Sequence, residues 1–200
     1  TVNPNEVAGM VGDLADLEMM YSFKSFFEQC LGSRNLECRQ DRIYINPNER
    51  MNYIFNSSIK GIEESDLILL VGANPRLEAT ILNTRIRKAY LKNKLKIYSI
   101  GDPGDLTYPY QNIGSSTSII RDIASGLHDV SDKIKKSKKP LIIVGESALY
   151  AEVGEYIFET LKNFLINNNF ITKDWNALNV LVQQASRVGA IDLGIYSINN

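Results

Sequence analysis

Polar residues follow two apolar runs of this sequence at positions where they could bind a phosphate or a nucleotide. Gly72, Asn74 and Arg76 come directly after the run from Leu67 to Val71, and Asp102 follows the next apolar run along the chain. An arginine beside the first N–H groups of a helix favours an anion, and an acidic residue just past a strand can hold ribose hydroxyls. This arrangement is typical of the carboxyl edge of a parallel sheet, where open α/β folds bind ligands.

Helix and turn chemistry explains some of the same residues without a ligand. Asn74 is a good helix N-cap, and Pro75 suits the first helical position because its missing N–H costs nothing there. Gly72, Gly101 and Gly145 each end an apolar run, and glycine at such a turn meets a steric need in most α/β domains. Two interpretations therefore stay open, a ligand-binding edge and a set of ordinary turns.

Apolar runs and helical periodicities alternate along the chain, which predicts the elements that position these residues. We expect strands at residues 67–71, 96–100, 140–144 and 178–181, and irregular chain with one or two short strands over 34–56. We expect a first helix at residues 13–31, with Asp13 as its N-cap and Gly32 as its stop. We expect further helices at residues 59–65, 75–93, 118–125, 129–136 and 148–167, and a last helix through 188. The alternation predicts a single α/β domain over residues 1–200, in which a doubly wound, mostly parallel sheet carries helices on both faces.

Composition excludes several classes of protein. The chain has 200 residues, 44% of them apolar and 22% charged, with a formal net charge of -1. That length and balance indicate one globular core and offer no basic footprint for nucleic acid. The apolar runs fall far short of the roughly 20 residues that a membrane span requires. We therefore expect no nucleic-acid partner and no direct membrane span.

The chain has few residues that could bind a metal or act as a catalytic nucleophile. Cys30 and Cys38 are the only cysteines and His128 is the only histidine, so the chain alone cannot supply a His-containing zinc site or a multi-thiolate iron-sulfur site. A Ser-His-Asp mechanism would depend on His128, which we expect in a solvated loop. We predict no catalytic residue and no metal ligand. Because Thr1 stands first, we also expect a piece of a longer protein.

Several segments, taken together and in order, resemble a known family. They include EESDLILLVGANPRLEA at residues 63–79 and KPLIIVGESAL at 139–149, with shorter strings at 83–88, 105–108, 122–126 and 175–194. The resemblance is to the molybdopterin-oxidoreductase-type domain of the large iron-sulfur G subunit of respiratory NADH:quinone oxidoreductase, complex I. It extends over nearly the whole chain.

The resemblance implies a structural, cofactor-free domain that supports the peripheral arm carrying electrons from NADH to quinone. It implies that the iron-sulfur clusters lie upstream, in the remainder of the same subunit. The implied partners are that remainder and other peripheral-arm subunits. The implied location is peripheral, on the cytoplasmic face of a bacterial inner membrane or the matrix side of the mitochondrial inner membrane.

The resemblance also bears on the ligand edge. In molybdenum-containing relatives the corresponding domain helps to hold a molybdopterin guanine dinucleotide, and its second strand typically ends in an Asp-Pro-Arg turn. Here Gly104 replaces that arginine after Asp102, and Asp105 adds a negative charge. We therefore expect Gly72, Asn74, Arg76 and Asp102 to form a vestigial ligand edge that binds no cofactor.

Two other functions stay open. One is a fragment of an active oxidoreductase of the formate dehydrogenase or nitrate reductase type, with the same four residues around a molybdopterin guanine dinucleotide. The other is an unrelated nucleotide-binding module that shares only the strand-glycine-helix chemistry. The loop at Tyr108 to Tyr110 is a candidate contact with partner subunits, because tyrosine is enriched at interfaces, or it packs back on its own sheet.

Overall fold

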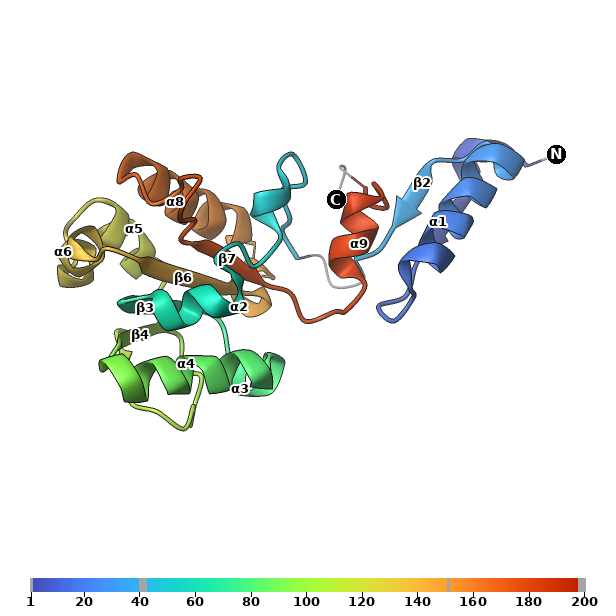
Figure 1. The fold of residues 1–200 in the computed structure, drawn as a ribbon. Helices are drawn as coiled ribbons and strands as arrows, with labels where there is room; N and C mark the ends of the chain where they lie inside the picture. Colours follow the sequence, from blue (N-terminus) through green and yellow to red (C-terminus); the bar gives the residue numbers. More distant parts are fainter. Residues whose placement is uncertain (1, 40–42, 151, 198–200) are drawn as a thin grey trace. The chain divides into compact units, whose positions relative to one another are not determined.

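The structure is a computed structural model that describes residues 2–39, 43–150 and 152–197 (Figure 1). The chain divides into two compact units, a larger one at 44–183 and a smaller one made of 1–43 and 184–200. Each unit is described by itself. The single domain expected over residues 1–200 stays a prediction.

A five-stranded parallel sheet forms the centre of the larger unit. Its strands are β3 (Leu67–Val71), β4 (Lys96–Ile100), β5 (Gln111–Asn112), β6 (Pro140–Gly145) and β7 (Leu178–Leu181). Their order is β5-β4-β3-β6-β7, and every pair is parallel. The chain therefore builds outward from β3 to β5, returns to the middle, and builds β6 and β7 on the other side. This order confirms the doubly wound α/β fold.

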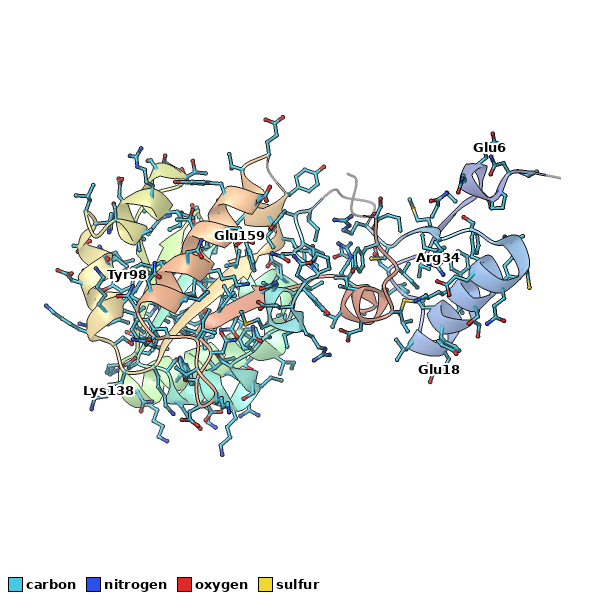
Figure 2. All side chains as sticks on the ribbon, turned by 90° about the horizontal axis from the view of Figure 1, so that it is seen from above. Glu6, Glu18, Arg34, Tyr98, Lys138 and Glu159 are labelled. Carbon is cyan, nitrogen blue, oxygen red and sulfur yellow. The ribbon has the colours of Figure 1, made fainter. Side chains whose placement is uncertain are left out.

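Helices cover both faces of this sheet. They are α2 (Ser58–Gly61), α3 (Pro75–Glu78), α4 (Thr80–Asn93), α5 (Ser118–Ala124), α6 (Asp129–Lys136), α7 (Glu146–Leu149) and α8 (Gly154–Asn167), with 3-10 turns η3 (Arg50–Asn52) and η4 (Ile62–Glu64). Figure 1 shows α3 and α4 on one side of the sheet and α5, α6 and α8 on the other. Figure 2 shows the side chains that these helices and strands carry, with Tyr98 of β4 and Glu159 of α8 labelled. On the α4 side, Ile68 and Leu70 pack in one cluster with Ile86 and Ala89.

Two helices expected to be continuous are interrupted. The helix predicted at 75–93 breaks at Ala79, whose φ of -153° and ψ of 72° are not helical. The helix predicted at 148–167 is the short α7 followed by α8. Apolar spacing does not reveal either break, because side chains on both sides of each break still face the core.

The smaller unit contains a second, two-stranded parallel sheet. Its elements are η1 (Pro4–Glu6), β1 (Ala8–Met10), α1 (Leu17–Phe26), the π-helical turn η2 (Phe27–Leu31), β2 (Asn35–Glu37) and α9 (Arg187–Asp192). The sequence predicted neither β1 nor the full extent of α9. A three-residue strand leaves too short a pattern for its alternation to be recognised.

The first helix begins later than expected. Its N-cap is Asp16, whose Oδ1 accepts the Met19 N–H at 2.7 Å, so the cap expected at Asp13 is wrong. Asp13 instead lies 3.6 Å from the Arg187 guanidinium in an ion pair. The predicted stop at Gly32 is confirmed, because this glycine takes the left-handed conformation with φ of 67°.

The tyrosine loop packs back on its own sheet at Tyr108. This side chain is only 7% exposed and belongs to the core cluster of the α4 side. Its hydroxyl donates to Asn83 Oδ1 at 2.8 Å, and Asn83 Nδ2 donates to the Leu106 carbonyl at 3.1 Å. Burial raises the pKa of Tyr108. Tyr108 is therefore a core residue, and of the two alternatives left open for this loop, packing on its own sheet holds at Tyr108.

Tyr108→Phe should destabilise the larger unit by about 1–2 kcal/mol, because it leaves the buried Asn83 oxygen without its donor. The free energy of unfolding in urea measures this loss. Tyr150→Phe is the matched control, since Tyr150 is 62% exposed. Equal midpoints for the two variants would show that the buried hydrogen bond contributes nothing.

Candidate functional site

The carboxyl edge of the larger sheet brings the four predicted residues close together. Strands β3, β4 and β6 are in register, so that Val71 pairs with both Ile100 and Val144 and the chain turns away from all three at the same edge. A cavity of about 120 Å³ at this edge is lined by Gly72, Ala73, Asn74, Glu78, Ser99, Ile100, Gly101, Asp102, Pro103 and Ser147. Arg76 lies beside it on α3.

A second cavity at this edge is mostly apolar. It measures about 260 Å³ and is lined by Val71, Gly72, Ile100, Gly101, Ser115, Thr117, Ile120, Ser147, Ala148, Val153 and Ile157. Ligand sites for small organic molecules usually measure roughly 300–1,000 Å³. Each cavity, taken by itself, is therefore below this range.

Both ends of the Asn74 amide are hydrogen-bonded within the protein. Its Oδ1 accepts the Leu77 N–H at 3.2 Å and caps α3, as the sequence predicted. Its Nδ2 donates to the Pro103 carbonyl at 2.9 Å and joins the loop after β3 to the loop after β4. These two bonds fix the orientation of the Asn74 amide.

Arg76 and Asp102 are likewise held by nearby loop residues. Arg76 Nη1 donates to the backbone carbonyl of Asp105 at 2.7 Å and pairs with its carboxylate at 2.5 Å. The Thr107 N–H and the Arg76 guanidinium hold the pKa of Asp105 below its usual value. Asp102 Oδ1 accepts the Gly104 N–H at 2.9 Å and the Tyr110 hydroxyl at 3.1 Å. The charge of Arg76 is thus locally neutralised, and Asp102 is oriented by its own turn.

Glu78 adds a second negative group where an anion would bind. Its Oε2 atom is buried and has no hydrogen-bond partner. Burial raises the pKa of this carboxyl above its usual value. The short α3 also contributes little positive potential, since it has only four residues. This edge therefore disfavours a phosphate.

The loops after β3 and β6 meet at the point where the strand order reverses, which is where doubly wound folds bind dinucleotides. Ser147 Oγ donates to the Gly72 carbonyl at 2.5 Å. A Cβ atom on Gly145 would lie 2.2 Å from that carbonyl oxygen and 2.6 Å from Ala73 Cα. A Cβ atom on Gly72 would lie 2.7 Å from the Ala148 nitrogen. Backbone atoms of the two loops are thus in close contact at this junction.

Ser147 is the contact residue that sequence reasoning missed. The sequence offered only its position two residues after Gly145, since nothing in a serine there indicates which carbonyl its hydroxyl meets. The three glycines, by contrast, stand together as their positions at the strand ends predicted. A Cβ atom on Gly101 would lie 3.9 Å from Gly72 Cα.

The residues considered for nucleophilic chemistry have structural surroundings. His128 lies in the turn between α5 and α6, where its Nδ1 accepts the Val130 N–H at 3.2 Å and caps α6. Cys38 is buried, and this burial raises the pKa of its thiol to about 11. Within residues 2–39, 43–150 and 152–197, no three His, Cys, Asp or Glu side chains gather as a metal site would require. No helix in this described part is both long and apolar enough to cross a membrane.

Comparison with known proteins confirms the resemblance seen in the sequence. Residues 1–200 match the family model described as molybdopterin oxidoreductase. The chain is 41% identical over 207 residues to the NADH-ubiquinone oxidoreductase 75 kDa subunit of Reclinomonas americana. It is 36% identical over 194 residues to the mitochondrial NADH dehydrogenase [ubiquinone] iron-sulfur protein 1 of Solanum tuberosum. It is 39% identical over 202 residues to the mitochondrial NADH-ubiquinone oxidoreductase 78 kDa subunit of Candida albicans.

These relatives are much longer than the chain. The three matches cover 98%, 97% and 98% of the chain, but only 30%, 26% and 28% of the respective relatives. The chain thus spans less than a third of the length of each.

Gly145→Ala should destabilise the larger unit by about 3 kcal/mol, because the new methyl group would overlap backbone atoms that have no room to move. The φ of -86° and ψ of 162° at Gly145 suit alanine, so the loss would report the contact and not backbone strain. Urea unfolding measures it. Gly12→Ala is the control, since a Cβ there meets nothing within 4 Å. An unchanged midpoint for Gly145→Ala would contradict this close backbone contact.

Glu78→Gln should raise the melting temperature at about pH 7 and leave it unchanged at about pH 4. Because burial raises the folded-state pKa, ionisation costs more free energy in the folded than in the unfolded chain. The native protein therefore loses stability as pH rises from the usual carboxyl pKa through the raised one, and glutamine avoids this loss. Glu155→Gln, at an exposed position in the first turn of α8, is the control. Equal shifts for both variants at both pH values would contradict the assignment.

Proposed function

The chain belongs to the molybdopterin oxidoreductase family, and from this premise we propose that it is a structural, cofactor-free domain of the large iron-sulfur subunit of an NADH:quinone oxidoreductase. Its relatives at 36–41% identity are subunits of NADH-ubiquinone oxidoreductase. In this proposal the domain supports the peripheral arm of complex I and carries out no step of electron transfer itself.

The observation that carries the cofactor-free proposal is the backbone contact between the loops after β3 and β6. A dinucleotide in a doubly wound fold lies across this junction. Here the Gly72 carbonyl accepts from Ser147, and Gly145 leaves no space for even one further carbon atom beside it. The paired Arg76 and the carboxyl of Glu78 support the same proposal through charge, because neither favours a phosphate. In this proposal, Gly72, Asn74, Arg76 and Asp102 are a vestigial ligand edge.

The proposed partners are the remainder of the same subunit and other peripheral-arm subunits of the complex. The relatives' names support this assignment, and their greater length leaves room for an iron-sulfur region outside the matched stretch. We place the domain on the matrix side of the mitochondrial inner membrane, or on the cytoplasmic face if the source is a bacterium. Its attachment to the membrane is then through its partners.

The enzyme alternative is a fragment of an active molybdopterin guanine dinucleotide oxidoreductase. The family match is compatible with it, but the charge and the closed junction at the carboxyl edge disfavour it. The other alternative, an unrelated nucleotide-binding module, does not account for the family match over residues 1–200.

Purification of the native complex through a tag on this chain tests the proposal. NADH:quinone oxidoreductase activity should co-purify, and the preparation should contain neither stoichiometric molybdenum nor guanine nucleotide. A thermal-shift titration of the chain with GDP should give no stabilisation at millimolar concentration, whereas a ligand at one hundred times its Kd would add about 2.7 kcal/mol. Sodium chloride at equal ionic strength is the control. Molybdenum and guanine nucleotide at one per chain would establish the enzyme alternative.

A further inference from the structure

The small sheet of β1 and β2 lacks the surroundings that parallel strands need. Each strand has three residues, and the pair is parallel, with Gly9 opposite Leu36. Parallel sheets occur almost only with both faces covered, and an isolated two-stranded sheet is marginal in water. The small sheet therefore indicates that a further strand or helix completes it.

One face of this sheet is covered by the α1–η2 helix. A Cβ atom on Gly9 would lie 2.6 Å from the Phe27 ring and 2.7 Å from the Phe23 ring, so the helix packs directly on the backbone of β1. Because successive side chains alternate between faces, Ala8 and Met10 point to the opposite face. Both are exposed, and Met10 is 57% exposed. The second face of the sheet is bare at β1.

The outer edge of β1 is open as well. The Val11 N–H donates to the Glu37 carbonyl at 3.0 Å, which shows that Val11 turns its backbone groups toward β2. The two-residue period of a strand gives Gly9 the same direction and turns the N–H and C=O groups of Ala8 and Met10 outward. In the described residues the order of this sheet is β1-β2, with no strand on the outer side of β1.

The far edge of β2 is occupied by local contacts. The Leu36 N–H, which turns away from β1, donates to the Arg34 carbonyl at 2.9 Å. The Cys38 N–H, on the same side, donates to Glu37 Oε1 at 2.9 Å. These contacts leave the edge of β1 as the place where a further strand could pair.

Exposed apolar side chains concentrate in the same unit. The smaller unit has less than a third of the chain but seven of the sixteen large apolar side chains that are exposed in the described residues. Those seven are Val2, Met10, Leu14, Leu17, Met19, Tyr21 and Phe26. Figure 2 labels Glu18 in the first turn of α1, the helix that carries or adjoins most of them. Such a density is typical of a surface that another segment covers.

We propose that a strand from the remainder of the same subunit pairs in parallel with the outer edge of β1, and that its connecting helix covers the bare face at Met10. The choice of occupant rests on the proposed function, because the matched relatives extend over more than three times the length of this stretch. A parallel strand needs a crossover connection, usually a helix, so one strand-helix segment supplies both missing parts.

Photo-crosslinking in the assembled complex tests the occupant. A photoreactive amino acid at Met10 should give cross-linked peptides from the same subunit, outside these 200 residues. The control position is Leu127, which is 81% exposed in the larger unit. Cross-links from Met10 to a second copy, to another subunit, or to nothing would overturn the proposal. If the tagged chain does not co-purify with the oxidoreductase, the proposed function fails, whereas a Met10 cross-link within its own polypeptide still supports the strand pairing.

Met10→Pro tests the strand pairing itself. Proline removes the outward N–H that a paired strand would use, while the bonds of Gly9 and Val11 to β2 are kept. The level of assembled subunit should fall several-fold for Met10→Pro relative to Met10→Ala, which shortens the same side chain but keeps the N–H. In the 200-residue chain alone, where the edge has no partner, the two variants should melt at similar temperatures. Equal assembly of both variants, or an equal difference in both settings, would overturn the pairing.

Discussion

The larger unit depends on the pairing of β3 with a neighbour on each side. All five residues of this strand are between 0% and 2% exposed. Its last residue, Val71, pairs with Ile100 of β4 and with Val144 of β6. A strand that is buried on both faces must be apolar throughout, as Leu67–Val71 is. Because the three strands end level, their turns lie together at one edge. The position of every residue at the candidate site follows from this register.

The sequence predicted the parts of the structure that depend on local chemistry. The buried run at β3, the Asn74 cap and the glycine stop at Gly32 each follow from residue type and spacing, and the structure has all three. The parallel doubly wound sheet follows from the alternation of strands and helices. These features need no knowledge of distant contacts.

The parts that were not predicted depend on contacts between residues far apart in the sequence. Asp13 and Asp16 are the same residue type, so either could cap the helix. Asp13 forms an ion pair with the distant Arg187, and Asp16 is the cap. Tyr108 is amphipathic, and its burial depends on a hydrogen bond to Asn83, 25 residues away. The contact of Ser147 with Gly72 spans 75 residues, so no local pattern could reveal it. At the candidate site, the sequence therefore identified the residues but not the hydrogen bonds and ion pairs that they form.

The meeting of Gly72 and Gly145 has an evolutionary consequence. If an ancestor of this domain held a dinucleotide, an arginine restored at Gly104 would not by itself recover the binding, since the loops after β3 and β6 are in close backbone contact. Recovery would require the β6–α7 junction to move away from the loop after β3. That movement would break the hydrogen bond from Ser147 Oγ to the Gly72 carbonyl before any ligand replaced it. The close approach of Gly72 and Gly145 therefore opposes any opening of this junction.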